Sequence, residues 1–414
     1  MTPVIVVLAA GPLQVPAIQE ARALGIRTIA IDQNPSAPGL AIADVGYVDN
    51  ILDPAIVVRI AKAESASGIM TLCTDAPVRT VASACQAIGA PALSICASEC
   101  ATDKWMMRQK LDEYGAPCPR FTAVHTLEEA SRAALLFGYP VAVKIRHGAG
   151  SRGIYRADSE QALSGRLAEA RAIQPDGPLL VEEWVEGPEI SVEGFCCDGA
   201  THIIAITDKL LYQGSSPVEL GHTQASSHSQ EIQQIVRECV GKGIRALGIN
   251  WSCFHAELKL SASGPRIIEI GARLGGDRIS THITPLSTGF NLLRAAILIA
   301  LGHCPSLTPI QDRGAAIRYF DTRHTGALKC ISGVRRIYDI PGLELLYLAS
   351  ERDGSLRPGF SIGPIRSSLD RYGHVIFSGC NAHEAVTRAE KALKAIIFEF
   401  ADGMRRDASG GSVY

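Results

Sequence analysis

The stretch from Phe254 to Leu274 constrains the fold more than any other part of the sequence. Apolar and polar residues alternate in two runs, 254–260 and 267–274, and Ser261–Pro265 between them has the composition of a turn. Period-two alternation on both sides of a turn predicts a β-hairpin that buries one face. The chain is therefore expected to place this hairpin against a core, with its polar face open.

The polar face of this predicted hairpin carries two glutamates. If the hairpin is symmetric about Ser263, Glu257 and Glu269 stand directly opposite each other, with Cβ atoms roughly 5 Å apart. Like charges so placed repel unless a cation compensates them, and Mg²⁺ is often held by one or two carboxylates together with substrate phosphates. Arg273 follows on the same face, where it can meet an anion. The alternative is a solvated face on which Lys259 and Arg273 neutralise two surface glutamates.

A lysine followed by a glycine-rich stretch forms a second informative segment. The apolar run Tyr139–Ile145 carries Lys144 near its end, and burying a lysine in such a run is costly unless it is paired. Residues 147–153 come next and include Gly148, Gly150 and Ser151. A strand-like pair follows them, so we expect a glycine-rich hairpin whose backbone N–H groups cover phosphates. A plain flexible turn is the alternative, and a P-loop motif is absent.

Two further segments concentrate polar residues. The strand-like run 179–185 leads into a turn that is rich in carboxylates, among them Glu182, Glu183 and Glu189. Backbone groups of such a segment can grip a purine, and a carboxylate suits ribose hydroxyls, although an acidic surface loop is the commoner outcome. The run 203–206 leads to Lys209, and a loop with Glu219 and His222 follows.

The two ends of the chain have their own patterns. Before residue 97, strand-like and helix-like segments alternate, which predicts a parallel sheet with crossover helices. The predicted strands there are 4–8, 28–31 and 69–73, and the predicted helices are 15–24 and 55–65. Only Gly11 stands in the first turn, so the dinucleotide-binding fingerprint is missing. Beyond residue 303 the predicted strands are 315–320, 343–348 and 374–377, followed by a helix over 382–398.

Composition limits the classes of function. The chain has 414 residues, enough for two or three packed units. Its formal net charge of −2 creates no field that attracts nucleic acid or an anionic membrane. Its twelve cysteines show no CxxC spacing, so we expect reduced thiols. The N-terminal apolar run lacks the basic segment of a signal peptide, and the run 292–301 is too short to span a bilayer, so a cytoplasmic protein is expected.

Taken in order, these segments resemble the ATP-grasp superfamily over essentially the whole chain. The matching features are Asp103–Lys104, residues 138–144, the glycine-rich stretch, residues 182–189, Lys209, and the glutamate pair with residues 270–273. The resemblance implies an α/β ATP-grasp fold. It also implies a Rossmann-like N-terminal domain with a parallel sheet at 1–97, an ATP-grasp domain at 98–302 with a flexible lid at about 121–187, and a C-terminal α/β domain at 303–414.

The resemblance also implies roles for individual residues. Lys104 and Lys144 would bind ATP phosphates together with the glycine-rich stretch, and Lys209 would join them as a catalytic residue. Arg273, the other catalytic residue, would contact the transferred phosphate and the developing oxyanion. The other implied ligands are Glu182 with the backbone of Glu183 and Val185 for adenine, Glu189 for the ribose hydroxyls, and Glu257 and Glu269 for Mg²⁺.

The run Glu269–Arg273 is similar to that of the L-amino-acid α-ligases, which make dipeptides. In that group a glutamate and a histidine spaced like Glu219 and His222 lie by the amino-acid substrate. Many ATP-grasp relatives have asparagine, as a further metal ligand, where this chain has Gly271, so a water would have to substitute for it. A ligase of this group has a tryptophan where this chain has Asp277, which implies a roomier or more polar substrate pocket.

The reaction that this resemblance implies joins a carboxylate to an amine. ATP, with Mg²⁺, phosphorylates the carboxylate; the amine then attacks the acyl phosphate, and ADP and phosphate leave. The expected partners are a small-molecule carboxylate and amine, both amino acids, with no nucleic acid and no membrane, and a homodimer is a family-level expectation. The alternatives are a purine-pathway or carboxylase-like ATP-grasp enzyme and a non-catalytic nucleotide-binding domain.

Overall fold

The computed structural model describes residues 2–148, 152–212, 218–307, 311–350 and 354–413. The chain forms two compact units and passes between them several times. The first unit comprises residues 1–204, 229–281 and 291–308, and the second comprises 205–228, 282–290 and 309–414. The predicted α/β fold with an N-terminal parallel sheet is confirmed. The domain boundaries at 97 and 302 stay predictions.

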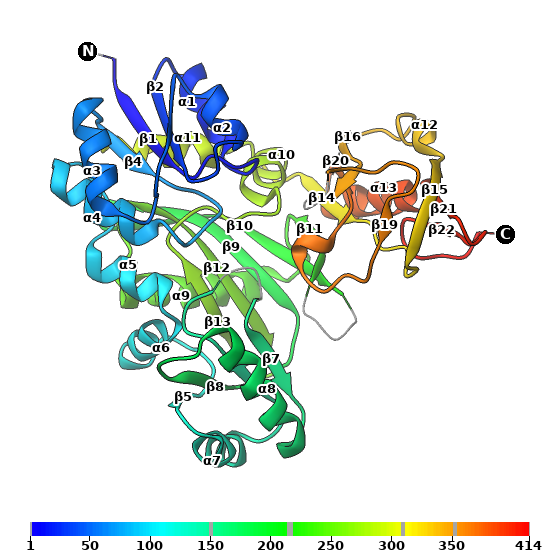
Figure 1. Cartoon of the computed structure of the whole chain (residues 1–414), viewed down its shortest axis with the longest axis horizontal. Helices are drawn as coiled ribbons and strands as arrows, with labels where there is room; N and C mark the ends of the chain where they lie inside the picture. The colour runs from blue at the N-terminus through cyan, green and yellow to red at the C-terminus, as the bar shows by residue number, and fades with distance from the viewer. Residues whose placement is uncertain (1, 149–151, 213–217, 308–310, 351–353, 414) are drawn as a thin grey trace. The chain divides into compact units, whose positions relative to one another are not determined.

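The first unit begins with a four-stranded parallel sheet in the order β3-β2-β1-β4. Strands β1, β2 and β4 are labelled near the N-terminus in Figure 1. All of β1 is buried, which is typical of a parallel strand covered on both faces. The predicted third strand is wrong at its end: β4 stops at Met70, and the chain leaves the sheet so that the Cys73 N–H donates to the Leu274 carbonyl. The elements are β1 (Val4–Leu8), α1 (Val15–Ala23), β2 (Arg27–Asp32), α2 (Pro38–Ile42), β3 (Val45–Val48), α3 (Pro54–Ala63), β4 (Gly68–Met70) and α4 (Val78–Ile88).

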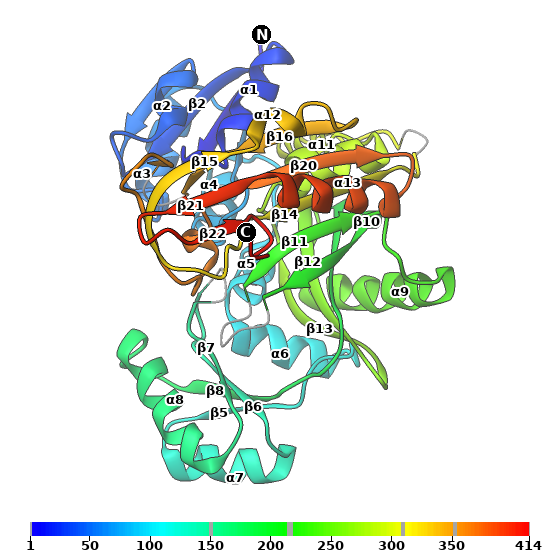
Figure 2. The same cartoon turned by 90° about the vertical axis from the view of Figure 1, so that its right-hand side faces the viewer.

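A second sheet in this unit is antiparallel, in the order β5-β8-β6-β7, with α7 and α8 against it (Figure 2). Its buried core mixes strand residues with the apolar stripes of both helices, such as Val143, Ala134 and Leu167. Lys144 is the last residue of β6, as the sequence predicts. The elements are β5 (Phe121–Val124), α7 (Leu127–Phe137), β6 (Val141–Lys144), β7 (Ile154–Ala157), α8 (Glu160–Ile173) and β8 (Leu179–Glu183).

The predicted hairpin forms the edge of a third group of strands, in which β13 pairs with β12 and β12 with β9. Helix α9 packs on β13, and α6 packs on α9. The division between the two compact units falls within β10 and within the short π-helix at residues 279–283. The elements are α5 (Ile95–Thr102), α6 (Lys104–Glu113), β9 (Glu189–Cys197), β10 (Ala200–Leu211), α9 (Gln230–Leu247), β12 (Ser252–Ser261), β13 (Gly264–Gly271), η1 (Ile279–Ile283) and α11 (Leu292–Ala300).

The second unit contains the antiparallel strand order β11-β14-β20-β16, with α13 packed on β14 and β20. The predicted strands near 315, 343 and 374 are confirmed, but the predicted helix ends at Ala395. From Ile397 the chain alternates and buries Phe398 and Phe400 as strand β21. The elements are β11 (Glu219–Gln224), α10 (Thr284–Thr288), β14 (Gly314–Tyr319), β15 (Gly326–Ser332), α12 (Val334–Ile337), β16 (Leu343–Tyr347), β17 (Ala349–Ser350), β18 (Gly354–Ser355), β19 (Ser361–Ile362), η2 (Ser368–Asp370), β20 (His374–Gly379), α13 (Ala382–Ala395), β21 (Ile397–Phe400) and β22 (Arg405–Asp407).

Two further expectations concern the cysteines and the membrane. Cys197 and Cys304 are joined by a disulfide, so the expectation of reduced thiols is wrong for this pair, while Cys85, Cys100 and Cys239 are free and buried. Within the described residues, no single helix has the length and apolar composition to cross a membrane. A bent pair of helices, 279–288 with 292–300, meets both criteria when taken together.

Candidate active site

The hairpin brings the two glutamates together as the alternating pattern predicts. Glu257 on β12 pairs with Glu269 on β13, and His255 pairs with Gly271. The assumed symmetry about Ser263 holds at these positions but is wrong near the turn, where Leu258 pairs with Ile267. One extra residue on β13 at position 268 forms a bulge that restores the register, so Ile267 lies in the core and not on the polar face.

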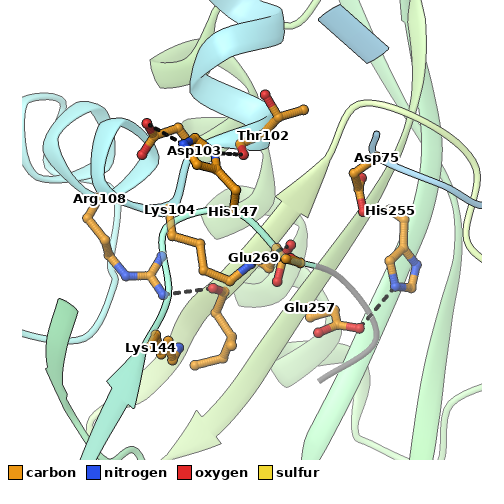
Figure 3. Close-up of polar contacts among 12 residues, drawn as sticks. Asp75, Thr102, Asp103, Lys104, Arg108, Lys144, His147, His255, Glu257 and Glu269 are labelled. Carbon is orange, nitrogen blue, oxygen red and sulfur yellow. Dashed lines mark hydrogen bonds and ion pairs between the residues drawn. The ribbon is translucent and has the colours of Figure 1, made fainter. Parts of the chain in front are cut away.

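Lys104 connects Glu269 to the glycine-rich stretch (Figure 3). Its Nζ lies 3.2 Å from Glu269 Oε1 and donates to the carbonyl of Gly148 at 2.9 Å. Lys104 begins α6, and Asp103 caps that helix through the N–H groups of Trp105 and Met106 while it also pairs with Arg146. Asp103 therefore fixes the start of α6, where Lys104 lies, and through Arg146 it also fixes the residue before the glycine-rich stretch. Gly150 and Ser151 lie outside the described residues.

Glu257 is held by a histidine that a second, buried glutamate orients. His255 Nε2 lies 3.2 Å from Glu257 Oε1, and its Nδ1 lies 2.7 Å from Oε1 of the fully buried Glu193. Burial lowers the pKa of His255, but the charge and hydrogen bond of Glu193, with those of Glu257, outweigh it and raise the pKa to about 9. An imidazole between two carboxylates fixes the direction in which the Glu257 side chain points.

Replacing this histidine tests whether it orients a metal ligand. If Glu257 holds the cation, as the resemblance implies, His255→Gln is expected to weaken Mn²⁺ binding in the presence of ADP by roughly 10- to 100-fold, the usual cost of losing such a partner. Electron paramagnetic resonance of free Mn²⁺ measures this directly. His324→Gln is the matched control, since His324 pairs with Asp402 in the other unit. Unchanged Mn²⁺ affinity in His255→Gln contradicts the orienting role.

Glu182, Lys144 and Arg108 form a buried group of three charged side chains, two of which are predicted to bind ATP. Glu182 is fully buried; Lys144 Nζ is 2.7 Å from its Oε2, and Arg108 Nε is 2.9 Å from its Oε1. Burial opposes ionisation of Glu182, but the charges of Arg108 and Lys144 prevail and lower its pKa to about 2. Arg108 Nη2 also donates to the Ile268 carbonyl at 2.7 Å, so the bulge of β13 is anchored to α6.

Arg273 lies in an ion pair that the sequence does not indicate. Its Nε and Nη2 donate to the two carboxylate oxygens of Asp75, each at 2.9 Å, and both side chains are largely buried. Burial lowers the pKa of Arg273, but the Asp75 carboxylate overrides this and raises it, so the guanidinium stays charged. Asp75 comes from the segment that leaves β4, far away in sequence.

The remaining predicted residues of the first unit lie around the end of β8. Glu183 accepts from Arg120, and Glu189 pairs with Lys259 at 3.1 Å. Val185 is partly buried in the connection between β8 and β9. Asp277 is partly buried in the turn that follows β13, where its φ is 52°.

Three predicted residues belong to the second compact unit and meet there. Lys209 on β10 is opposite His222 on β11, and its Nζ lies 3.5 Å from Glu219 Oε1. Ser368 Oγ donates to Glu219 Oε2, and Arg371 donates to the Glu219 carbonyl. His222 is buried, and its ring lies nearly perpendicular to that of Tyr319. The strand pairing therefore gathers Lys209, Glu219 and His222 within one unit.

Sequence reasoning missed four residues that hold the predicted ones in place. His255 had a signal, because it alternates with Glu257 on the polar face of the hairpin. Asp75, Arg108 and Glu193 had none, since each meets its partner only through contacts between segments distant in the chain.

Two segments of the chain match known domain families. Residues 137–282 match the ATP-grasp domain, and residues 318–401 match the L-amino acid ligase C-terminal domain 2. The chain is 26% identical to protein y4rH of Sinorhizobium fredii over 346 residues, 82% of this chain and 69% of that protein. It is also 26% identical to the alanine–anticapsin ligase of Bacillus subtilis over 266 residues, 59% of this chain but 55% of the ligase.

Solved structures show the same fold. An L-amino acid ligase from Bacillus licheniformis superposes with a TM-score of 0.81 at 20% identity, covering 96% of this chain and 99% of that one. A phosphoribosylglycinamide synthetase from Anaerococcus prevotii superposes with a TM-score of 0.76 at 21% identity, covering 97% and 100%. Residues 137–282 therefore form an ATP-grasp domain and residues 318–401 a C-terminal domain of the L-amino acid ligase type, and the predicted ATP-grasp fold is confirmed.

Proposed function

We propose that the protein is an ADP-forming ligase that joins two amino acids, or an amino acid and a related amine, through an acyl phosphate. The observation that carries the proposal is the direct opposition of Glu257 and Glu269, with Lys104 paired to Glu269 and Arg273 four residues after that same glutamate. The C-terminal domain match and the likeness to the alanine–anticapsin ligase support amino acids as the substrates.

The donor set fits a hard divalent cation. Two carboxylates that face each other across one strand pair supply the oxygen ligands that Mg²⁺ prefers, and their mutual repulsion favours a cation between them. Glu257 and Glu269 would hold it. When bound, Mg²⁺ would neutralise phosphate charge and favour phosphoryl transfer.

The protein's own groups then position the reactants. Lys104 and Lys144 would bind phosphate oxygens, and the backbone N–H groups after Gly148 would cover them. A substrate carboxylate oxygen attacks the γ-phosphorus of ATP, and the bond to the ADP oxygen breaks. The amine nitrogen then attacks the acyl carbon, losing a proton, and the phosphate leaves with its bonding electrons. Arg273 would stabilise the negative oxygen in both steps, because a fixed cation in a site with little water favours developing negative charge.

Three residues of the second unit are also assigned roles. Lys209 would bind phosphate, and Glu219 and His222 would face an amino-acid substrate. The contacts of Glu219 with Lys209 and Ser368 support this grouping, since they gather charged and hydroxyl groups on neighbouring segments of one unit.

Incubation of the protein with ATP, Mg²⁺ and amino acids, singly and in pairs, tests the proposal. We expect phosphate release that depends on amino acids, and a product whose mass is the sum of two substrates less one water. Release with bicarbonate but not with amino acids would replace this proposal by a carboxylase-like reaction. Absence of turnover with every carboxylate would favour a non-catalytic nucleotide-binding protein.

A further inference from the structure

We propose that Asp75 is a positioning residue that aims the guanidinium of Arg273 at the transferred phosphate. This inference rests on the proposed function, because it assigns a role to Asp75 in the same site. The carboxylate lies in the segment between β4 and α4, and Arg273 follows β13, so two distant parts of the first unit meet in this ion pair (Figure 3 labels Asp75).

The geometry of the pair decides which edge of the guanidinium faces a ligand. An arginine offers two edges for bidentate bonding: Nε with Nη2, and Nη1 with Nη2. Asp75 takes the first edge, with Oδ1 on Nε and Oδ2 on Nη2, each at 2.9 Å. A long contact of 3.4 Å from Nη1 to the Leu274 carbonyl lies on the other edge. That edge is therefore the one presented to an incoming anion.

The segment that carries Asp75 is fastened to the end of the hairpin. The Cys73 N–H donates to the Leu274 carbonyl at 3.1 Å, and Cys73 Sγ contacts the Gly275 carbonyl at 3.4 Å. Gln14, the residue just before α1, donates from its Nε2 to the Leu72 carbonyl at 2.6 Å. The two bonds of Cys73 tie the segment just before Asp75 to the two residues just after Arg273, so the carboxylate has a fixed place from which to orient the guanidinium.

Gly271 leaves the room that the pair occupies. A Cβ at position 271 would lie 3.1 Å from Asp75 Oδ1 and 3.1 Å from Arg273 Cζ, closer than ordinary van der Waals contact. Gly271 does not adopt a positive φ, so its backbone conformation is open to other residues. The glycine is thus explained by the ion pair beside it, which takes up the space that a larger side chain would need.

The test uses ADP with aluminium fluoride and Mg²⁺, a mimic of the phosphoryl group in transfer. Isothermal titration calorimetry gives the ratio of ADP affinity with and without aluminium fluoride. We expect Asp75→Asn to reduce this ratio by about 10-fold or more, up to about 100-fold, the cost of a small misplacement of a catalytic group. ADP binding alone should be unchanged. Gly271→Ala, which keeps every charged group but crowds the pair, should reduce the ratio in the same direction.

A double-mutant comparison separates orientation from a general structural effect. If Asp75 acts through Arg273, then Asp75→Asn/Arg273→Gln should match Arg273→Gln alone; losses that add would refute the proposal. Asp49→Asn, which removes the carboxylate from an exposed pair with Arg59 in the same unit, is the control and should behave like the wild type.

The remaining outcomes are also decisive. A ratio in Asp75→Asn that equals or exceeds the wild-type ratio would overturn the positioning role. A wild-type protein whose ADP affinity does not respond to aluminium fluoride would refute the proposed phosphoryl transfer, and the Asp75 proposal with it. A normal wild-type response that Asp75→Asn retains would refute the Asp75 proposal alone.

Discussion

Glu269→Gln is expected to reduce ADP release by at least about 100-fold, the scale of loss when one electrostatic contact to the reacting group is removed. The substitution preserves the size of the side chain and an oxygen that can still accept from Lys104. It removes only the charge, so a cation would keep a single carboxylate where the hairpin provides two. A coupled assay for ADP, with Mg²⁺ varied, measures the loss and shows whether more Mg²⁺ restores part of the rate.

The control for this experiment is an exposed glutamate in the same unit. Glu169 pairs with Arg166 one turn away on α8, so Glu169→Gln should leave the rate unchanged. Thermal unfolding of Glu269→Gln should resemble that of the wild type, because the side chain is partly exposed and its hydrogen bond is retained. ADP release at the wild-type rate by Glu269→Gln would remove the glutamate pair from the mechanism.

Glu182→Gln is expected to destabilise the folded protein by about 3–5 kcal/mol, because it leaves the buried cations Arg108 and Lys144 without a counter-charge. Arg108→Met should lower the free energy of unfolding by less, because the ion pair of Lys144 and Glu182, whose charges cancel, remains. This substitution also removes the bond to the Ile268 carbonyl. Urea unfolding followed by circular dichroism at pH 7 measures both. A larger loss in Arg108→Met than in Glu182→Gln would contradict this ordering.

The same substitution has a predictable pH dependence. The folded-state pKa of Glu182 is lowered to about 2 from its ordinary value of 4.5. Its stabilising contribution is therefore fully present above pH 4.5 and is lost as the pH falls toward 2. The difference in stability between the wild type and Glu182→Gln should shrink over that range. Glu169→Gln, at an exposed ion pair, should change stability by less than about 1 kcal/mol at any of these pH values.

The hairpin shows which features the local sequence pattern predicts and which it does not. Alternation of apolar and polar residues identified both strands and the face that holds Glu257 and Glu269, because side chains of a strand point to opposite faces in turn. The exact pairing of β12 with β13 was not determined by alternation alone. The turn is one residue shorter than assumed, and the bulge at Ile268, whose carbonyl Arg108 holds, brings the glutamates back into opposition. Strand alternation alone does not specify a bulge.

The β-α-β alternation before residue 97 likewise predicted the parallel sheet, because strands and crossover helices leave separate hydrophobic periods in the sequence. The end of the last helix was not predicted. Residues 397 and 398 continue an apolar pattern that suits either a helix or a strand, and their pairing with β15 settles the choice.

By itself, the sequence determined the two strands of the hairpin, their polar face and the position of Lys144 at a strand end, since each depends on neighbours a few residues apart. Only the tertiary structure decided that Asp75 holds Arg273, that Arg108 shares Glu182 with Lys144, and that Glu193 orients His255. Each of these contacts joins segments separated by tens to hundreds of residues. Such partners are selected by packing and by the cost of leaving a buried charge unpaired, and neither is visible in local spacing.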